Sequence, residues 1–598
     1  MSSTPTRPPL RAAFRLAWDA GPRWVVLQTA LAVGQGVLPL LGLWLMKLLV
    51  DAVAAGASSA DTDAAFEEVV VLVLLAAGAA LLGAFVRAGA SVASEIQGQV
   101  VHDHVHDLLH KKAVTVDLQD LEDPAMLDLL QRAQAEAPTR PTRLVGGLAQ
   151  VGQGIVSVIL MAGLLATLHW SISVLVVVAA IPALLIRARY ARVLHAWQVR
   201  RAQDDRATRY FGWLQTSPAN AKEIRLFSLG DLFRLRYREL RALLRGERLG
   251  IAKTRAMAEL FGQSLGLLVT FGAYAYVGKR VIDGTSTVGD LVMYAQAIQR
   301  GQAAVQGIFS GIAGLYEDGL FLDAFLSFLG LPERVATPRH PRPVPSRLSR
   351  GIVLEGLTFR YPSGGPAVID GLDARINVGE KIALVGPNGA GKTTLLKLLC
   401  RFYDPTAGRI RLDDVDLSEH APVELRAAIA CVFQDFVRYD LSAEENIRLG
   451  TAADVSREAV EDAARAAGVH DRIMALPEGY GTRLGRRFDG GRELSIGEWQ
   501  KIAFARAWLR DAPMLLLDEP ASALDARAEE EIIGRVLGLA EDRTALIVSH
   551  RLSTARRCDR IWVLDGGRLV EEGTHDDLVA AGGTYAAMHA AWTRDIAG

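Results

Sequence analysis

Long apolar stretches dominate the first third and middle of the chain. A helix needs roughly 20 apolar residues to cross a bilayer core of about 30 Å. The stretch from Val69 to Val86 is the clearest, because it contains no charged residue. A buried helix of a soluble protein explains one such run but not a succession of them. The predicted membrane spans are 24–50, 69–90, 144–168, 171–194, 256–278 and 287–316.

The charges between these stretches predict how the chain crosses the membrane. The connection 51–68 has acidic residues and no Lys or Arg, whereas the stretch after the fourth span is rich in arginine. Positively charged loops stay in the cytoplasm. We therefore expect a multi-pass protein of the cell membrane with both termini in the cytoplasm. The arginines are Arg187, Arg189, Arg192, Arg200, Arg201, Arg206 and Arg209.

The connections after the second and fourth spans are long, polar and helix-forming, so their helices are expected to continue into the cytosol. Two short breaks interrupt them, at Leu121–Pro124 and at Ser217–Asn220. Short turns of this kind could touch a cytosolic domain.

The character of the chain changes near residue 331. The segment 331–350 is a linker by its proline content, and after it short β-like runs alternate with helices, as in an α/β domain. The predicted division is a six-span all-α transmembrane domain over 1–330, the linker, and an α/β domain over 351–598. Lys plus Arg (66) balance Asp plus Glu (67), which argues against a nucleic-acid partner. The three cysteines lack metal or disulfide spacing and are expected to be reduced.

A phosphate-binding loop follows the apolar run 382–385. The sequence Gly386-Pro387-Asn388-Gly389-Ala390-Gly391-Lys392-Thr393 fits G-x-x-x-x-G-K-[ST] between a strand and a helix that begins near Thr394. Its glycines allow backbone N–H groups to surround phosphate oxygens, Lys392 reaches the β and γ phosphates, and Thr393 can ligate Mg²⁺. The α/β domain is therefore expected to be a P-loop NTPase that uses ATP and Mg²⁺. The predicted nucleotide-binding residues of this loop are Gly386, Asn388, Gly389, Gly391, Lys392, Thr393 and Thr394.

A second apolar strand, 514–517, ends in Asp518 and Glu519. A carboxylate at the end of a core strand can hold the metal through water, and its neighbour can polarise the attacking water. Asp518 is predicted to bind Mg²⁺ and Glu519 to be the general base. Two solvated acids at a strand end would be the alternative if no P-loop were present.

Residues 351–598 resemble the nucleotide-binding domain of the ABC transporter family, and the whole chain resembles an exporter-type half-transporter. The resemblance implies roles for four further residues. Tyr361 would stack on adenine, Gln434 would contact Mg²⁺ and sense the γ phosphate, Asp525 would belong to the D-loop, and His550 would be the switch histidine. The matching motifs are Phe359-Arg360-Tyr361-Pro362, Val432-Phe433-Gln434-Asp435, Ser522-Ala523-Leu524-Asp525 and Val548-Ser549-His550-Arg551.

The family signature LSGGQ is altered here, as Leu494-Ser495-Ile496-Gly497-Glu498. The resemblance implies that Ser495 and Gly497 complete the ATP site of the opposite protomer. Ile496 disfavours a positive φ and Glu498 adds charge near the phosphates, so turnover is in question more than nucleotide binding. One copy of each motif and six spans predict a dimer, and a homodimer is the economical form, with a heterodimer left open.

The predicted function is ATP-driven transport by alternating access, with outward export of an amphipathic drug, lipid or peptide. One alternative keeps the fold but makes the chain an importer or a gated channel. Another is a regulatory membrane protein that only senses nucleotide, and the presence of both Glu519 and His550 argues against it.

Two groups of polar residues remain without an assigned role. Polar residues within the spans are candidates for a substrate cavity, or else for helix packing or snorkelling. Three histidines four residues apart would share one helix face, and two histidines so spaced can bind a transition metal, although a solvated helix face is the expected interpretation. The span residues are Gln35, Lys47, Glu259, Gln263, Gln299 and Arg300, and the histidines are His102, His106 and His110.

Overall fold

The computed structural model describes residues 9–57, 61–123, 126, 129–130, 133–134, 140–362, 364–520, 526–540 and 543–597. The chain forms two compact units. The first comprises Met1–Val114 and Asp128–Leu331, and the second comprises Thr115–Leu127 and Pro332–Gly598. The predicted domain boundaries at 330 and 351 thus differ from these units chiefly at the segment Thr115–Leu127, which groups with the second unit.

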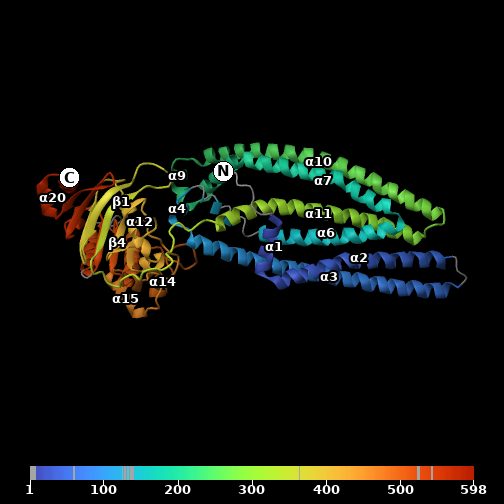
Figure 1. Cartoon of the computed structure of the whole chain (residues 1–598), viewed down its shortest axis with the longest axis horizontal. Helices are drawn as coiled ribbons and strands as arrows, with labels where there is room; N and C mark the ends of the chain where they lie inside the picture. The colour runs from blue at the N-terminus through green and yellow to red at the C-terminus, as the bar shows by residue number, and fades with distance from the viewer. Residues whose placement is uncertain are drawn as a thin grey trace. The chain divides into compact units, whose positions relative to one another are not determined.

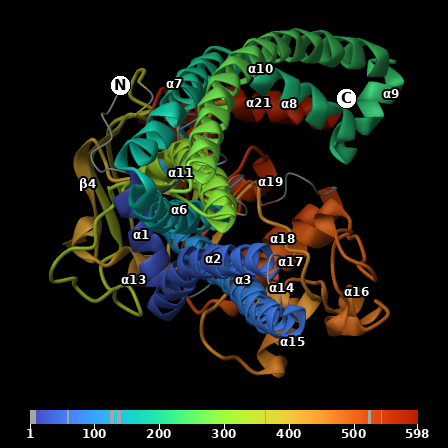
Figure 2. The ribbon, with the colours of Figure 1, turned by 90° about the vertical axis from the view of Figure 1, so that its right-hand side faces the viewer.

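The first unit is built from long helices. Within it α6 lies beside α11, α7 lies beside α10, and α2 and α3 run together (Figures 1 and 2). Its helices are α1 (Pro9–Ala20), α2 (Pro22–Gly56), α3 (Thr62–Thr115), α6 (Arg140–Leu168), α7 (Trp170–Arg200), α8 (Ala202–Thr216), η1 (Pro218–Asn220), α9 (Ala221–Leu226), α10 (Gly230–Ile282) and α11 (Val288–Leu329).

Each of the six predicted membrane spans falls in a different long helix of this unit. Among the described residues, four helices are long and apolar enough to cross a bilayer, namely α2, α3, α6 over Arg143–Leu168, and α10. The spans predicted in α7 and α11 stay predictions. The second predicted break, at Ser217–Asn220, lies where η1 joins α8 to α9.

Small residues allow the spans to approach closely. A Cβ on Gly154 of α6 would lie 2.5 Å from Ile308 of α11, and one on Gly311 of α11 would lie 2.7 Å from Val151 of α6. Helices in a membrane associate through such close packing, because burial from lipid supplies little driving force. A core of Leu43, Met161, Leu165 and Val277, all at most 2% exposed, fills the space between α2, α6 and α10.

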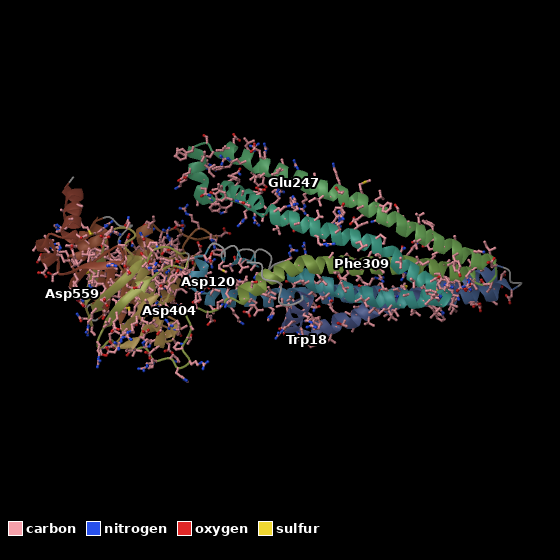
Figure 3. The ribbon with its side chains drawn as sticks, turned by 45° about the horizontal axis from the view of Figure 1, so that its top comes forward. Trp18, Asp120, Glu247, Phe309, Asp404 and Asp559 are labelled. Carbon is pink, nitrogen blue, oxygen red and sulfur yellow. The ribbon has the colours of Figure 1, made fainter. Side chains whose placement is uncertain are left out.

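Ion pairs and hydrogen bonds fasten pairs of helices at their polar ends. Asp51 of α2 accepts hydrogen bonds from Thr287 (3.0 Å) and from the backbone N–H of Gly289 (2.8 Å) at the start of α11. Along α7 and α10, Glu247 accepts from the indole N–H of Trp197 at 2.7 Å and also pairs with Arg201 (Figure 3).

Three of the polar residues predicted within the spans have partners in the first unit. Lys47 pairs with Asp290 at 2.8 Å, Glu259 pairs with Arg255 at 2.9 Å, and Gln299 donates to the Tyr274 hydroxyl at 2.9 Å. These contacts fit a role in holding helices together as well as they fit a role in lining a substrate cavity.

The predicted histidine face is present on α3. The rings of His102 and His106 are 4.5 Å apart between centroids, and those of His106 and His110 are 5.6 Å apart. Burial, followed by the charges of these two neighbours, lowers the pKa of His106. Over the described part of the chain, no group of three or more metal-ligating side chains gathers around one point.

The second unit contains two sheets. Its strands are β1 (Ile352–Phe359), β2 (Ile369–Ile376), β3 (Lys381–Val385), β4 (Ala407–Leu412), β5 (Val415–Asp416), β6 (Ile429–Val432), β7 (Met514–Asp518), β8 (Thr544–Val548), β9 (Arg560–Asp565) and β10 (Arg568–Gly573). An antiparallel sheet has the order β2-β1-β4-β5, and a six-stranded sheet has the order β10-β9-β3-β8-β7-β6.

Helices connect these strands. They are α4 (Leu118–Leu121), α12 (Lys392–Leu399), η2 (Leu417–Glu419), α13 (Pro422–Ala427), α14 (Ala443–Arg448), α15 (Arg457–Ala466), α16 (His470–Met474), η3 (Gly479–Gly481), α17 (Ile496–Leu509), α18 (Ala526–Leu539), α19 (Leu552–Ala555), α20 (His575–Ala581) and α21 (Thr584–Ala597).

The strands β9, β3, β8, β7 and β6 are parallel neighbours, and only β10 at the edge is antiparallel. All five residues of β7 are buried, as expected for a strand with helices over both faces of a parallel sheet. The uninterrupted apolar runs 382–385 and 514–517 therefore mark two inner strands.

The described part of the first predicted cytosolic break, Leu121–Asp123, lies in the second unit and makes several contacts there, whereas Pro124 lies outside the described residues. Glu122 pairs with Lys397 of α12 at 2.7 Å and accepts a short hydrogen bond from the Tyr403 hydroxyl. Asp120, labelled in Figure 3, pairs with Arg334 at 3.2 Å. The side chains of Asp120 and Glu122 thus hold the described part of this segment, Thr115–Asp123, against this unit.

The buried β7 strand generates a stability prediction. Leu516 is fully buried, and its truncation in Leu516→Ala leaves a cavity that the surrounding sheet fills only in part. We expect a loss of about 2–5 kcal/mol in stability, measured as a lower melting midpoint of the purified protein. The matched variant Leu449→Ala, at a position 49% exposed, should melt close to the wild type. Equal melting of the two variants would contradict the burial of β7.

Candidate functional site

The carboxyl ends of four parallel strands bring the predicted site residues to one edge of the six-stranded sheet. The P-loop follows β3, His550 follows β8, Asp518 ends β7, and Gln434 follows β6. In open α/β sheets ligands bind at this edge. Residues separated by more than 160 positions in the sequence therefore become neighbours.

Glycine at two P-loop positions is required by the backbone. Gly386 has φ 153° and Gly391 has φ 103°, and a Cβ on either would meet main-chain oxygens, at 2.1 Å from Leu564 O and 2.8 Å from Val368 O. Gly389, also at positive φ, and Asn388 are exposed at the tip of the loop. The loop runs directly into α12, whose first backbone N–H groups can bind phosphate.

Lys392 is the first residue of α12 and is only 7% exposed. Its ammonium donates to the carbonyls of Gly386 at 2.8 Å and Pro387 at 3.0 Å, so the side chain folds back over the loop. Burial lowers the pKa of Lys392, and the nearby carboxylates of Glu519 and Asp518 oppose that effect. The lysine is thus held at the centre of the predicted phosphate cradle.

Glu519 lies between two side chains that hold both of its carboxylate oxygens. The Gln434 amide donates to Oε2 at 3.0 Å, and His550 Nε2 lies 3.0 Å from Oε1. The backbone of Glu519 has φ 48°, an uncommon conformation for a residue with a side chain. Such strained residues are concentrated at functional sites.

The surroundings of His550 favour its neutral form. Burial and the positive charge of Lys392 lower its pKa, and these effects outweigh the attraction of Glu519. A neutral imidazole can donate one N–H to Glu519 while its other nitrogen accepts.

Asp518 and Thr393 supply oxygen atoms beside the lysine. Burial raises the pKa of Asp518, although a hydrogen bond from the Thr393 side chain works against that rise. Carboxylate, hydroxyl and amide oxygens are the donors that Mg²⁺ prefers. The donor set of Asp518, Thr393 and Gln434 therefore fits a hard divalent cation.

Tyr361 follows β1 and is fixed by its neighbours. Its hydroxyl lies 3.0 Å from Thr394 Oγ1, and its ring makes edge contacts with Phe359 (5.0 Å) and Tyr403 (5.5 Å). The tyrosine predicted to stack on adenine is thereby tied to α12 and the P-loop.

The altered signature forms the start of α17. Ser495 is the N-cap, its hydroxyl accepts from Glu498 N–H, and Glu498 Oε2 accepts from Ser495 N–H at 2.7 Å, which completes a capping box. Ile496 is the first helical residue and has no positive φ, so a side chain there adds no backbone strain. The expected conflict at position 496 does not occur.

Glu498 also pairs with Arg472 of α16 at 2.6 Å. Burial alone would raise the pKa of Glu498, but the hydrogen bonds from Ser495 and from Arg472 outweigh it and lower the pKa. In this conformation the added carboxylate is neutralised by Arg472 instead of facing the phosphate loop unpaired.

Not every predicted site residue contacts the P-loop of its own chain. Over the described residues, no hydrogen bond or ion pair links Ser495 or Gly497 to the P-loop. Asp525 lies outside the described residues.

Sequence reasoning missed several residues that support the site. Arg472 neutralises Glu498, and buried Gln500 donates to the backbone carbonyl of Pro520 at 2.6 Å, which ties α17 to the turn after Glu519. Tyr403 and Glu122 likewise have no motif around them. These contacts could not be predicted from the sequence, because the partners are far apart along the chain and each is an ordinary polar side chain when considered alone.

Comparison with known proteins identifies the same two parts. Residues 25–300 match the family model of the ABC transporter transmembrane region, and residues 369–522 match the family model described as ABC transporter. The chain is 29% identical over 488 residues to the subtilin transport ATP-binding protein SpaT of Bacillus subtilis, covering 80% of this chain and 78% of that protein.

Two further relatives are matched over a smaller share. An ATP-dependent lipid A-core flippase of Chromohalobacter salexigens is 37% identical over 354 residues, 59% of this chain and 60% of that protein. A β-(1→2)glucan export ATP-binding/permease protein of Brucella abortus is 39% identical over 332 residues, 55% and 53% of the two chains. A solved bacterial Atm1-family ABC exporter with ATP bound has a TM-score of 0.81 and 25% identity, over 96% of this chain and 98% of that one.

Helical spans followed by a P-loop ATPase with a capped signature helix define an ATP-driven membrane transporter. The chain belongs to the ABC transporter family, with the architecture of an exporter-type half-transporter. The predicted resemblance and fold class are confirmed. Its C-terminal part is an ATP-binding domain of the kind that couples ATP hydrolysis to transport.

The position of Glu498 generates a prediction about the altered signature. Glu498→Gln keeps a residue that can complete the capping box but loses the ion pair with Arg472. We expect ATPase activity within about twofold of the wild type and a stability loss of about 1 kcal/mol or less at neutral pH. Since the folded-state pKa of Glu498 is lowered, its contribution is complete above the ordinary value of 4.5 and disappears as the pH falls through the folded pKa.

The measurement is the difference in melting midpoint between wild type and Glu498→Gln from pH 7 down to pH 4. Arg472→Gln is the matched control, because it removes the other half of the ion pair and should give the same difference at pH 7. A large rise in ATPase activity of Glu498→Gln would instead show that the carboxylate acts on the phosphates.

Proposed function

We propose that this chain works as a homodimer that exports an amphipathic substrate, a drug, lipid or peptide, by alternating access. The printed names of its relatives concern subtilin, lipid A-core and a β-glucan, which share no single chemistry. The proposal therefore extends to export of an amphipathic molecule and not to one of these compounds. Both termini and the ATPase domain would lie in the cytoplasm, as the arginine-rich connections suggest.

The observation that carries this proposal is the placement of Glu519. A carboxylate at the end of β7, held on both oxygens by Gln434 and His550, is positioned to polarise a water molecule next to the P-loop. Holding both oxygens orients the base before the reaction, which is where general-base catalysis gains its efficiency. A domain that only senses nucleotide would not need this arrangement.

The roles of the remaining site residues follow from their positions. Backbone N–H groups of the P-loop and Lys392 would bind the β and γ phosphates, and Tyr361 would contact adenine. Thr393, Asp518 and Gln434 would hold Mg²⁺, which when bound neutralises charge developing on the phosphate oxygens. His550, whose surroundings favour its neutral form, can accept or donate a hydrogen bond beside the γ phosphate while keeping Glu519 in place.

The dimer is proposed because one chain carries half of each composite site. Ser495 and Gly497 begin a capped helix whose N-terminal N–H groups favour a phosphate, yet no described contact joins them to the P-loop of the same chain. A second copy would supply the missing half to each ATP. The intact Glu519, His550 and Lys392 favour two identical protomers over an unlike partner.

Coupling to transport is proposed to pass through the first cytosolic turn. Glu122 contacts Lys397, which lies on the same helix as Lys392, and Tyr403, which touches the ring of Tyr361. Movement of α12 when nucleotide binds would thus reach the turn at residues 117–123 through two side chains.

Glu519→Gln tests the hydrolytic role. The amide keeps the hydrogen-bonding shape but cannot accept a proton, so we expect ATP binding to persist and ATPase activity to fall on the order of 10²- to 10⁴-fold. The assay is phosphate release by the purified protein in lipid vesicles, together with nucleotide binding by fluorescence. Glu458→Gln, at an exposed position of α15, is the matched control and should retain full activity. Near-normal hydrolysis in Glu519→Gln would move the base elsewhere.

Glu122→Ala tests the coupling contact. It removes the partners of Lys397 and Tyr403 without touching the phosphate cradle, so basal ATPase activity should change by less than about threefold. Stimulation by substrate and vesicle transport should both be lost. Glu333→Ala, which removes an exposed carboxylate of the linker, is the control expected to retain stimulation. Normal transport by Glu122→Ala would eliminate this contact as the coupling route.

A further inference from the structure

The helix α17 carries more than the altered signature. Ser495 caps its first turn, and Gln500, further along the same helix, is only 3% exposed. Trp499 and Ile502 of this helix belong to the same apolar core as Leu517 of β7. A helix packed in this way moves as one body, because its backbone hydrogen bonds and the dense core around it resist local bending.

Gln500 ties this helix to the turn that follows the predicted general base. Its side-chain Nε2 donates to the backbone carbonyl of Pro520 at 2.6 Å, and both residues are buried. Pro520 is the residue directly after Glu519. The hydrogen bond therefore fixes the chain immediately beyond the base.

Several anchors from different elements hold Glu519. Its backbone N–H donates to Val548 O at the end of β8, at 3.1 Å. Its carboxylate is held by Gln434, which follows β6, and by His550, which follows β8. The bond from Gln500 holds the next residue of the turn. Among these anchors, Gln500 is the one that belongs to the signature helix.

Stability alone does not account for a glutamine at position 500. The Gln500 Oε1 atom is buried and, over the described part of the chain, has no hydrogen-bond partner. A buried polar atom without a partner costs free energy, and an apolar side chain of similar size would avoid that cost. Such a side chain could not supply the N–H donor for Pro520. The amide is therefore explained by its hold on the turn.

The path from the signature to this turn is short. Ser495 and Gln500 are separated by roughly 7.5 Å along the helix axis, at about 1.5 Å per residue. In the proposed dimer, the N-terminus of α17 faces the ATP bound by the partner subunit, while Glu519 acts on the ATP of its own chain. A shift of α17 would thus move the turn after Glu519. Misplacing a reacting group by about 1 Å can change a rate by about 100-fold, so a small shift is sufficient.

We propose that Gln500 is a positioning residue that makes hydrolysis of one ATP depend on the presence of the other. It transmits the position of the signature helix, set by the ATP of the partner subunit, to the orientation of Glu519. This inference rests on the proposed homodimer and deepens it, because it names the side chain through which the two ATP sites affect each other.

The test is ATPase activity of the full-length protein in lipid vesicles as a function of ATP concentration. Wild type should show a Hill coefficient above one, as expected for coupled sites. Gln500→Met keeps the length of the side chain but has no N–H donor. It should lower the Hill coefficient to one and kcat by roughly tenfold, with ATP binding and the melting midpoint close to those of wild type. A purely structural role would instead change the melting midpoint.

Gln500→Asn retains an amide donor on a shorter side chain and should give an intermediate Hill coefficient. It carries the same comparison in the event that Gln500→Met melts far below the wild type. Lys501→Met is the matched control, because it places the same side chain at the next position of α17, where the lysine is partly exposed. This variant should keep the Hill coefficient and kcat of wild type.

Mixed dimers test the direction of the effect. Lys392→Ala in one copy removes its ATP, and the rate of hydrolysis by the other copy should then fall. The fall should disappear when that other copy carries Gln500→Met, because the connection is already broken. An equal fall in both backgrounds would contradict a route through Gln500.

The outcomes separate this inference from the proposed dimer. A Gln500→Met protein as cooperative as wild type would overturn the inference and leave the dimer intact. A wild type that is dimeric by light scattering but hydrolyses ATP without cooperativity would do the same. A monomeric wild type with full ATPase activity would overturn both.

Discussion

The site depends on one constraint, the parallel register of β3, β8, β7 and β6, which ends four strands at one edge of the sheet. That register is what brings Glu519 between Gln434 and His550 and next to Lys392. Each contact is a single hydrogen bond or ion pair of modest energy, so the arrangement relies on the buried sheet to hold it. The same buried sheet fixes the turn after β7, and this allows Glu519 to keep its positive φ.

Many of the charged side chains in both units are paired within the protein. In the ATPase domain nearly every buried charge has a protein partner, and even the added carboxylate of the signature, Glu498, is neutralised by Arg472. In the first unit Lys47 pairs with Asp290 and Glu259 pairs with Arg255. Unbalanced charge is costly in both settings.

The turn that contains Glu122 is flanked on both sides in the sequence by segments of the first unit. It belongs to the chain of the membrane domain, yet it forms a compact unit with the ATPase domain through Lys397, Tyr403 and Arg334. Lys397 lies on α12, the helix that follows the P-loop, and the ring of Tyr403 contacts the ring of Tyr361. These residues contact the turn and also lie near the predicted nucleotide site. Nucleotide binding can therefore shift the position of the turn.

The sequence alone determined the elements whose signals are local. Apolar runs identified the four helices that are long and apolar enough to cross a membrane. The P-loop pattern marked the loop between β3 and α12, and Asp518 with Glu519 marked the end of an inner strand. Such signals are local because hydrophobic periodicity and phosphate chemistry depend on adjacent residues. Contacts between distant residues were decided only by the tertiary structure. Sequence reasoning expected Glu498 to add charge near the phosphates and Ile496 to strain the backbone, but packing gave Glu498 the partner Arg472 and placed Ile496 in a regular helix. The partners of Glu122, Lys397 and Tyr403, likewise depend on tertiary packing, which no local pattern encodes.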